Sequence, residues 1–220
     1  MPDTANLKSR IAGGEFDYLA LLHALREYAR PRDRITDLLR QGEIVRVKKG
    51  IYVFGEGAGA RPFSREVLAN LICGPSYISL DSALYHHGFI AERPAAVTSA
   101  VLGRPRRYST PVGLFIYRQL SFAAYRIGID LALSPSGRPF LIATPEKALV
   151  DKIHDGRGLS LLTPNGMTAW LVENLGITPE RLAGLDIQKL AAIRDSFGSR
   201  KIRLLHKVVR GLATGKERLP

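Results

Sequence analysis

The stretch that decides the fold of the first part of the chain is ARPRDRITDLLRQGEIVRVKKGIYVF, residues 29–54. Pro31 suits the first turn of a helix, because an N–H at that position would have no helical partner. Behind it, apolar residues recur at the i, i+3, i+4 spacing of one helix face, namely Ile35, Leu38 and Leu39. Gly42 suits a C-terminal stop. The sequence therefore predicts a helix over about residues 31–41.

The second half of this stretch predicts a β-hairpin. Apolar and basic residues alternate there with the period of a half-buried strand, in the order Val45, Arg46, Val47 and Lys48. Gly50 tolerates the positive φ of a tight turn. The residues after it, IYVF, are good strand formers. We expect a tight hairpin with a basic tip.

A helix is also expected upstream, in FDYLALLHALREY (16–28), where leucines recur at helical spacing. Two helices joined by a short turn can place the second one in the major groove of DNA. A hairpin directly after them can lie along the neighbouring backbone as a wing. We therefore expect residues 1–55 to form a winged helix-turn-helix DNA-binding domain.

The expected second helix has a mixed outer face, because Asp33 and Asp37 lie there among basic residues. These acids could accept hydrogen bonds from cytosine, or they could pair with Arg34 and Arg40. Phosphate contacts are expected from Arg30, Arg46, Lys48 and Lys49. Base-edge contacts are expected from Arg32, Arg34, Thr36 and Arg40. The alternative is that all these charges form only a solvated helix face and hairpin.

The overall composition is consistent with a polyanion partner. The formal net charge is +12 and the hydrophobic fraction is 45%, which favours a folded protein that binds phosphate; a merely basic enzyme is the alternative. No apolar run approaches the roughly 20 residues that span a bilayer, and the first residues show no signal-peptide pattern. We expect a cytoplasmic protein without membrane contact. Cys73 is the only cysteine, so no internal disulfide can form.

After a glycine-rich linker, GEGAGARP (55–62), a second unit is expected over residues 62–220. Short β-like runs and helices alternate to about residue 155, and the pattern beyond is helical. The expected fold class is α+β, with the winged helix-turn-helix followed by a mixed α/β domain and a helical C-terminal part. Secondary phosphate or antitoxin contacts are expected in a loop and on the last helix, at Arg104, Arg106, Arg107, Lys201, Arg203 and Lys207. For the last helix, an ordinary solvated face is the alternative.

Two groups in the second unit resemble chemical sites. His86 and His87 are adjacent on a helix, so their side chains point about 100° apart and do not easily share one ion. Thr144, Pro145 and Glu146 in ATPEKALVDKI read as a helix start. The chain has no phosphate-binding or dinucleotide-binding glycine motif, no nucleophile elbow and no zinc spacing. We expect no catalytic residue, no metal, no cofactor and no enzymatic activity.

The markers PRDRITDLLRQGEI and RVKKGIYVFG, with YISLDSALYHHGFI (77–90) and ATPEKALVDKI (143–153) downstream, resemble the AbiEi-type antitoxins of type IV toxin–antitoxin systems. The resemblance covers most of residues 16–155. It implies a repressor whose first domain binds inverted repeats in double-stranded operator DNA. It also implies a second domain that counters an AbiEii-like nucleotidyltransferase toxin, without a stable complex.

Two other functions stay open at this point. One is a nucleic-acid-processing enzyme, with a nuclease-like second domain that the winged helix targets. Its candidate acids are Asp81, Glu146 and Asp151. The other is a transcription factor whose second domain senses a ligand.

Overall fold

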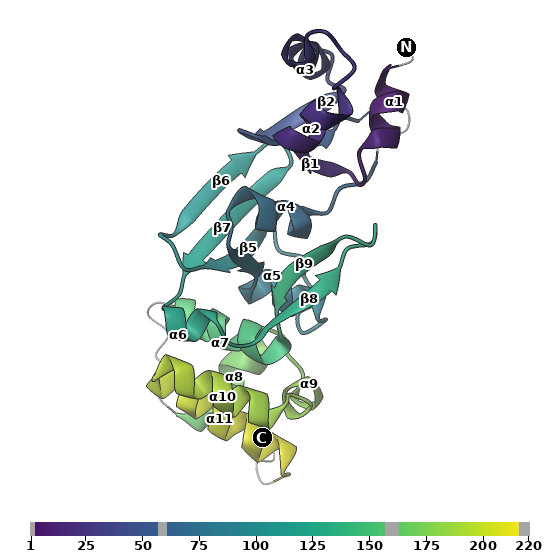
Figure 1. Cartoon of the computed structure of the whole chain (residues 1–220). Helices are drawn as coiled ribbons and strands as arrows, with labels where there is room; N and C mark the ends of the chain where they lie inside the picture. The colour runs from purple at the N-terminus through teal and green to yellow at the C-terminus, as the bar shows by residue number, and fades with distance from the viewer. Residues whose placement is uncertain (1–2, 57–60, 157–162, 216–220) are drawn as a thin grey trace.

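The computed structural model describes residues 3–56, 61–156 and 163–215. The chain is a mixed α+β protein with two separate sheets. Figure 1 shows an elongated molecule with three parts along its length. A three-stranded sheet with helices lies at one end, a six-stranded sheet in the middle, and a layer of helices at the other end.

The first part follows the sequence expectation closely. Its strands form an antiparallel sheet in the order β1–β3–β2. The predicted helix and hairpin of residues 29–54 are confirmed, with Gly42 and Gly50 at φ +71° and +85°. Its elements are α1 (Asp3–Arg10), β1 (Glu15–Asp17), α2 (Tyr18–Ala24), α3 (Pro31–Arg40), β2 (Ile44–Lys48) and β3 (Ile51–Phe54).

The helix predicted over residues 16–28 is shorter than expected at both ends. The first residues of that segment belong to β1, which pairs with β3. Asp17 then caps α2, because its side chain accepts a hydrogen bond from the Ala20 N–H at 2.8 Å. In β1, Glu15 and Phe16 are buried, whereas Asp17 is exposed.

The middle sheet has the strand order β6–β7–β5–β4–β9–β8. The pairs β5–β7 and β4–β9 are parallel, and the other pairs are antiparallel. The strands are β4 (Ser76–Ile78), β5 (Ala96–Val101), β6 (Arg106–Thr110), β7 (Gly113–Gln119), β8 (Ile129–Leu133) and β9 (Pro139–Ala143).

Helices accompany the middle sheet and form the whole of the described C-terminal part, as predicted. The π-helix η1 (Trp170–Asn174) continues directly from α8. The α-helices are α4 (Arg65–Ile72), α5 (Leu80–His86), α6 (Phe122–Tyr125), α7 (Pro145–Asp155), α8 (Pro164–Ala169), α9 (Pro179–Ala183), α10 (Ile187–Phe197) and α11 (Arg200–Ala213).

Buried apolar side chains form two clusters. The smaller one lies within the first part and joins α1, α2 and α3 to its sheet. The larger one fills the middle and the C-terminal part, and it also includes Val47, Ile51 and Val53 of the hairpin. The hairpin therefore packs with one face into the core of the second unit.

One loop prediction was wrong. Arg106 and Arg107 are not in a loop but begin β6, which pairs with β7 along its whole length. The hydrophobicity pattern does not predict this strand, because Arg106, Arg107 and Ser109 are polar and exposed. An edge strand needs little apolar surface. Arg104 does lie in the connection between β5 and β6. Of the expected linker, residues 57–60 are outside the described residues.

Candidate nucleic-acid interface

Helix α3 presents one buried and one exposed face, in the register expected from the sequence. Ile35 and Leu38 are 4% and 1% exposed, so they fix the inner face. Arg34 is half-buried at the flank, and the outer face is open to solvent. The exposed candidates on α3 are Arg32, Thr36 and Arg40.

Each of the two acids on α3 lies near an arginine three residues away in the sequence. Asp37 Oδ1 lies 2.9 Å from Arg40 Nη2, so this pair forms a charge-assisted hydrogen bond. Asp33 Oδ2 lies 4.0 Å from Arg30 Nη1, a looser contact. The expectation that Asp37 could pair with Arg40 is thus confirmed. Both pairs are exposed, and exposed pairs rearrange at little cost.

The hairpin holds its three basic residues in different environments. Arg46 is exposed, and its guanidinium lies 5.8 Å from the centre of the Tyr52 ring. Lys49 is exposed at the tip. Lys48 instead turns toward the second unit, where Nζ donates to the Ile72 carbonyl at 2.6 Å.

The simple alternation predicted for β2 was therefore wrong at Lys48. The register of β2 against β3 shifts between Arg46 and Lys48, as in a β-bulge. A bulge re-aims the side chains that follow it. The Lys48 ammonium lies 4.7 Å from the centre of the Tyr108 ring on β6, a cation–π contact. No hydrophobicity pattern in the sequence signals this shift.

The arginines of β6 lie next to this contact. Arg106 Nη1 donates to the Tyr108 hydroxyl at 3.1 Å. Lys48, Tyr108 and Arg106 therefore connect the hairpin tip to the edge of the middle sheet. Three arginines of this edge are exposed, namely Arg104, Arg106 and Arg107.

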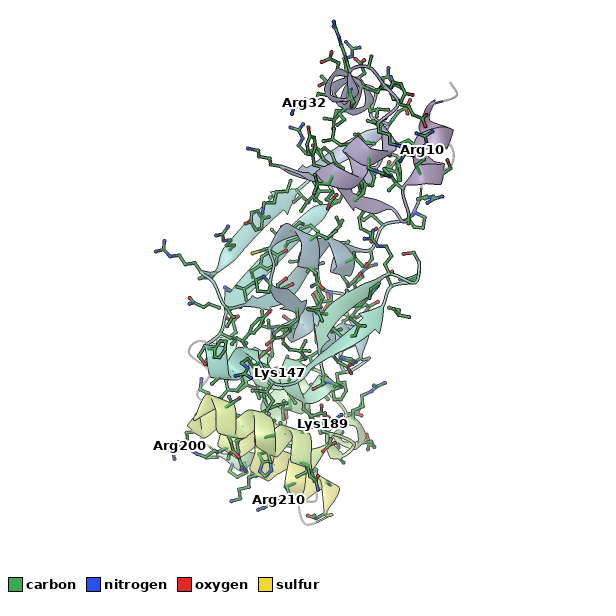
Figure 2. The ribbon with its side chains drawn as sticks, viewed as in Figure 1. Arg10, Arg32, Lys147, Lys189, Arg200 and Arg210 are labelled. Atoms are coloured by element: carbon green, nitrogen blue, oxygen red, sulfur yellow. The ribbon has the colours of Figure 1, made fainter. Side chains whose placement is uncertain are left out.

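The basic residues of α11 lie far from α3. Figure 2 shows Arg32 at one end of the molecule and Arg200 at the other. Lys201 Nζ reaches the Gly156 carbonyl at 3.3 Å, and Arg203 Nη1 reaches the Gly198 carbonyl at 3.4 Å. Lys207 is exposed. The structure does not bring these three residues together with the other candidates.

His87 and Asp81, which the sequence analysis considered for a chemical role, both have structural contacts. His87 Nε2 lies 2.8 Å from the Ala143 carbonyl oxygen, and Asp81 Oδ1 pairs with Lys152 Nζ at 2.7 Å. Among the described residues, no group of three or more histidine, cysteine or acidic side chains could hold a metal ion.

Helix α7 contains a buried ion pair between Lys147 and Asp151. The sequence analysis named Asp151 only as a candidate acid of the nuclease alternative and did not predict this pair. Lys147 and Asp151 are 0% and 2% exposed, and their charged ends are in direct contact. Asp151 Oδ2 also accepts hydrogen bonds from the hydroxyls of Tyr77 at 3.1 Å and Ser79 at 2.7 Å. Burial lowers the pKa of Lys147 and raises that of Asp151. The i, i+4 spacing of a lysine and an aspartate was the available signal.

The expected helix start at Thr144 is confirmed. Its hydroxyl accepts a hydrogen bond from the Lys147 N–H at 3.4 Å, and Pro145 follows in the first turn. Glu146 Oε1 accepts a hydrogen bond from the Asp186 N–H at 3.0 Å, which ties α7 to the start of α10.

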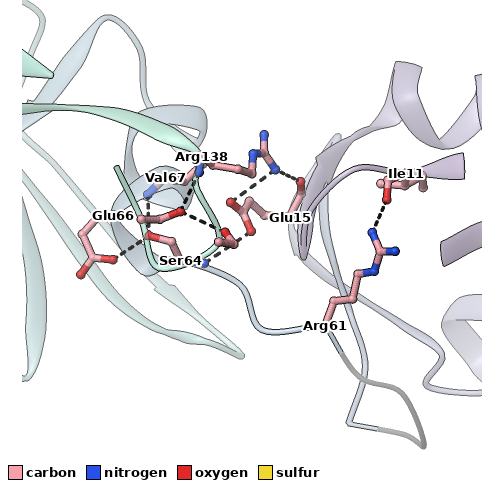
Figure 3. Close-up of polar contacts among 9 residues, drawn as sticks. Ile11, Glu15, Arg61, Ser64, Glu66, Val67 and Arg138 are labelled. Carbon is pink, nitrogen blue, oxygen red and sulfur yellow. Dashed lines mark hydrogen bonds and ion pairs between the residues drawn. The ribbon is translucent and has the colours of Figure 1, made fainter. Parts of the chain in front are cut away.

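A second buried carboxylate joins the first part to the middle sheet, and Figure 3 shows it at the centre of the contact. Glu15 is 0% exposed. Its Oε1 lies 3.3 Å from Arg138 Nη1, and its Oε2 accepts a hydrogen bond from the Ser64 N–H at 3.4 Å. Burial raises the pKa of Glu15, and Arg138 partly opposes this rise. Arg61 adds a bond to the Ile11 carbonyl at 2.8 Å.

Comparison with solved structures finds chains of similar fold. The chain is similar to the Rv2827c protein from Mycobacterium tuberculosis, at 17% identity and a TM-score of 0.48. The match covers 100% of this chain and 81% of that one. No family model and no curated protein matches the chain. A search of the described helices finds none with the length and apolar character to cross a membrane.

Proposed function

We propose that the first part of the chain is a winged helix-turn-helix that binds double-stranded DNA. The observation that carries the proposal is the element order α1–β1–α2–α3–β2–β3, with the exposed face of α3 beside a basic hairpin. In this arrangement α3 enters the major groove, and the β2–β3 hairpin contacts the adjacent backbone. The net charge of +12 adds a general attraction to phosphate.

The contacts divide between bases and phosphates. Base-edge contacts are assigned to Arg32, Arg34, Thr36 and Arg40 of α3, where the exposed Asp37–Arg40 pair can open at little cost. Phosphate contacts are assigned to Arg30, Arg46 and Lys49. Lys48 supports them by holding the hairpin against the second unit. Further phosphate contacts are assigned to the β6 edge, at Arg104, Arg106 and Arg107.

We further propose that the DNA is the operator of the chain's own operon and that the second unit is an antitoxin of AbiEi type. The support is the resemblance of the sequence markers in residues 16–155. Inverted repeats are the expected operator, and a nucleotidyltransferase toxin is the expected functional partner. The test is a growth assay in bacteria whose growth is inhibited by the toxin encoded in the neighbouring gene. Co-expression of this chain should restore growth, and failure to restore it contradicts the antitoxin role.

The internal contacts of Asp151 argue against the nuclease alternative. Its carboxylate is 2% exposed and already receives hydrogen bonds from Lys147, Tyr77 and Ser79. A carboxylate that binds a catalytic metal needs oxygen lone pairs that are free to face the metal ion.

The DNA proposal is tested by a salt titration. Binding to an operator fragment and to random DNA is measured by fluorescence anisotropy at several salt concentrations. We expect the observed binding constant of the full chain to fall steeply with salt on both DNAs, with tighter binding to the operator. A chain that binds neither DNA at low salt contradicts the proposal.

A further inference from the structure

The positive charge of the chain is concentrated at the end opposite to α3. Residues 186–215, which include α10 and α11, contain seven basic and two acidic side chains, whereas residues 1–56 contain ten and eight. The excess is therefore five charges in this helical layer and only two in the first part. Figure 2 shows Lys189 and Arg210 on this layer, at the other end of the molecule from Arg32. The proposed contacts of α3 and the hairpin do not account for this excess.

One face of α11 carries three exposed cations. Arg203, Lys207 and Arg210 follow one another at positions i, i+4 and i+7, so they lie within about 60° of rotation around the helix axis. We call these three residues the α11 face. The opposite side of the helix is fixed in the core by four side chains that are 0% exposed, namely Ile202, Leu205, Val208 and Val209.

The acids of this layer do not neutralise the α11 face. Asp186 caps α10, where its side chain accepts hydrogen bonds from backbone N–H groups. Asp195 pairs with Arg194 at 2.8 Å. Helix α9, which also packs against α11, carries one acid and one base, Glu180 and Arg181. Within the described part of the chain, no residue of the α11 face forms an ion pair.

This arrangement of charges lowers the stability of the helix. Like charges three or four positions apart repel each other on a helix surface. The first turn of α11 contains basic residues and no acid, which opposes the helix dipole. Burial is the main cause of the lowered pKa of His206, and the positive charges of Arg194 and Arg210 add to it. An anionic partner would relieve this repulsion.

The chemistry of this layer fits nucleic acid better than an acidic protein. Among the described residues, none of the large apolar side chains that are exposed lies on α9, α10 or α11. Protein interfaces bury an apolar centre, whereas phosphate contacts need only cations and hydrogen-bond donors. Duplex DNA carries one negative charge per roughly 1.7 Å of its axis. A helix face about 10 Å long can therefore contact several phosphates.

We propose that the α11 face binds the phosphate backbone of a second segment of duplex DNA, so that one chain holds two segments at its opposite ends. Contacts to phosphates carry no sequence information, so this second segment can have any sequence. The holding of two segments rests on the proposed function of α3, whereas the α11 contact itself does not. The affinity for the operator is determined by the base contacts of α3, so a change on α11 leaves that affinity unaltered.

The test counts how many duplexes one full chain binds. A duplex of random sequence, about one and a half turns long, is added in excess at low salt, and sedimentation velocity measures the stoichiometry. We expect two duplexes per wild-type chain. The α11 variant Arg203→Gln/Lys207→Gln/Arg210→Gln should bind one duplex, because it retains α3. For the second duplex, the slope of log binding constant against log salt should be about −3, the value for three phosphate contacts.

The control variant is Arg93→Gln/Arg126→Gln/Arg181→Gln, which removes the same charge from exposed arginines outside the α11 face. It should still bind two duplexes, and thermal melts show that each variant is folded. Glutamine is a good helix former, so the α11 variant should melt no earlier than the wild type.

Three results would overturn the proposal. The first is an α11 variant that binds as many duplexes as the wild type, and the second is a control variant that loses the second duplex as well. The third is displacement of the second duplex by poly-glutamate as effectively as by DNA, which would assign the α11 face to an acidic protein. A wild type that binds one duplex and an α11 variant that binds none would contradict the function of α3 alone, so the two proposals fail separately.

Discussion

Helices α3 and α7 start from similar sequences and end in opposite environments. Both have proline at their first position and carry an acid–base pair one turn apart. The pair on α3, Asp37 and Arg40, has side chains 41% and 76% exposed. The pair on α7, Lys147 and Asp151, is 2% exposed or less. The same local pattern therefore marks a candidate DNA surface in one place and a core contact in the other.

The difference teaches that burial, rather than residue type, separates a binding charge from a structural one. A buried charge needs its partner, because desolvation of an unpaired ion costs several kcal/mol. An exposed charge can exchange its partner for a phosphate at little cost. The predictions below change α7, α3 or the β2–β3 hairpin, one at a time, and compare the outcomes.

The largest expected effect is on stability, in α7. Lys147→Met leaves the buried Asp151 carboxylate without its cation, and we expect the free energy of unfolding to fall by about 3–5 kcal/mol. Urea denaturation followed by circular dichroism measures it. Lys152→Met is the control on the same helix. Its pair with Asp81 has side chains 26% and 31% exposed, so the change should cost less, about 1 kcal/mol. Equal losses in the two variants would show that Lys147 does not stabilise Asp151.

The next effect is on DNA affinity, in α3. Arg32→Ala should cost about 1–3 kcal/mol of binding to the operator and reduce the preference over random DNA. Stability should change little, because the side chain is exposed. Arg200→Ala on α11, at the far end of the molecule (Figure 2), is the matched control and should leave affinity within about twofold. If both variants lose affinity equally on both DNAs, general charge rather than α3 binds the DNA.

The sequence could predict the bounds of the elements in this comparison but not the long-range contacts of their side chains. The bounds of α3, the hairpin and the capped start of α7 follow from proline, glycine and apolar spacing, which act locally. The buried pair of α7 does not, because Tyr77 and Ser79 meet Asp151 only after the chain folds. Lys48 is a similar case, since one register shift turned it from the expected outer face to Tyr108.

The short strand β1 and the carboxylate on it show the same limit. Glu15 precedes a helical pattern and looks like an ordinary surface acid in the sequence. Its burial depends on Arg138, which is 123 positions further along the chain. Long-range contacts of this kind leave no mark on the local spacing of residues.

A smaller effect is expected in the hairpin. Lys49→Ala removes one proposed phosphate contact, so the slope of log binding constant against log salt should decrease by about 0.9 on every DNA. Lys48→Ala should change that slope less, because its ammonium is engaged with Ile72 and Tyr108. Anisotropy titrations at four or more salt concentrations measure both. A larger change in slope for Lys48→Ala than for Lys49→Ala would mean that the hairpin leaves the second unit when it binds DNA.

The smallest effect tests the exchange of partners directly. Asp37→Asn removes the acid that pairs with Arg40, and we expect a loss of only about 0.2–1 kcal/mol in the free energy of unfolding. DNA affinity should rise by a few-fold, because Arg40 no longer has to leave a carboxylate and one negative charge near the phosphates is gone. Asp151→Asn on α7 is the matched change, and there the loss should fall on stability, with no gain in affinity. If Asp37→Asn weakens specific binding and spares random DNA, Asp37 accepts a hydrogen bond from a base, and the exposed pair of α3 is itself part of sequence recognition.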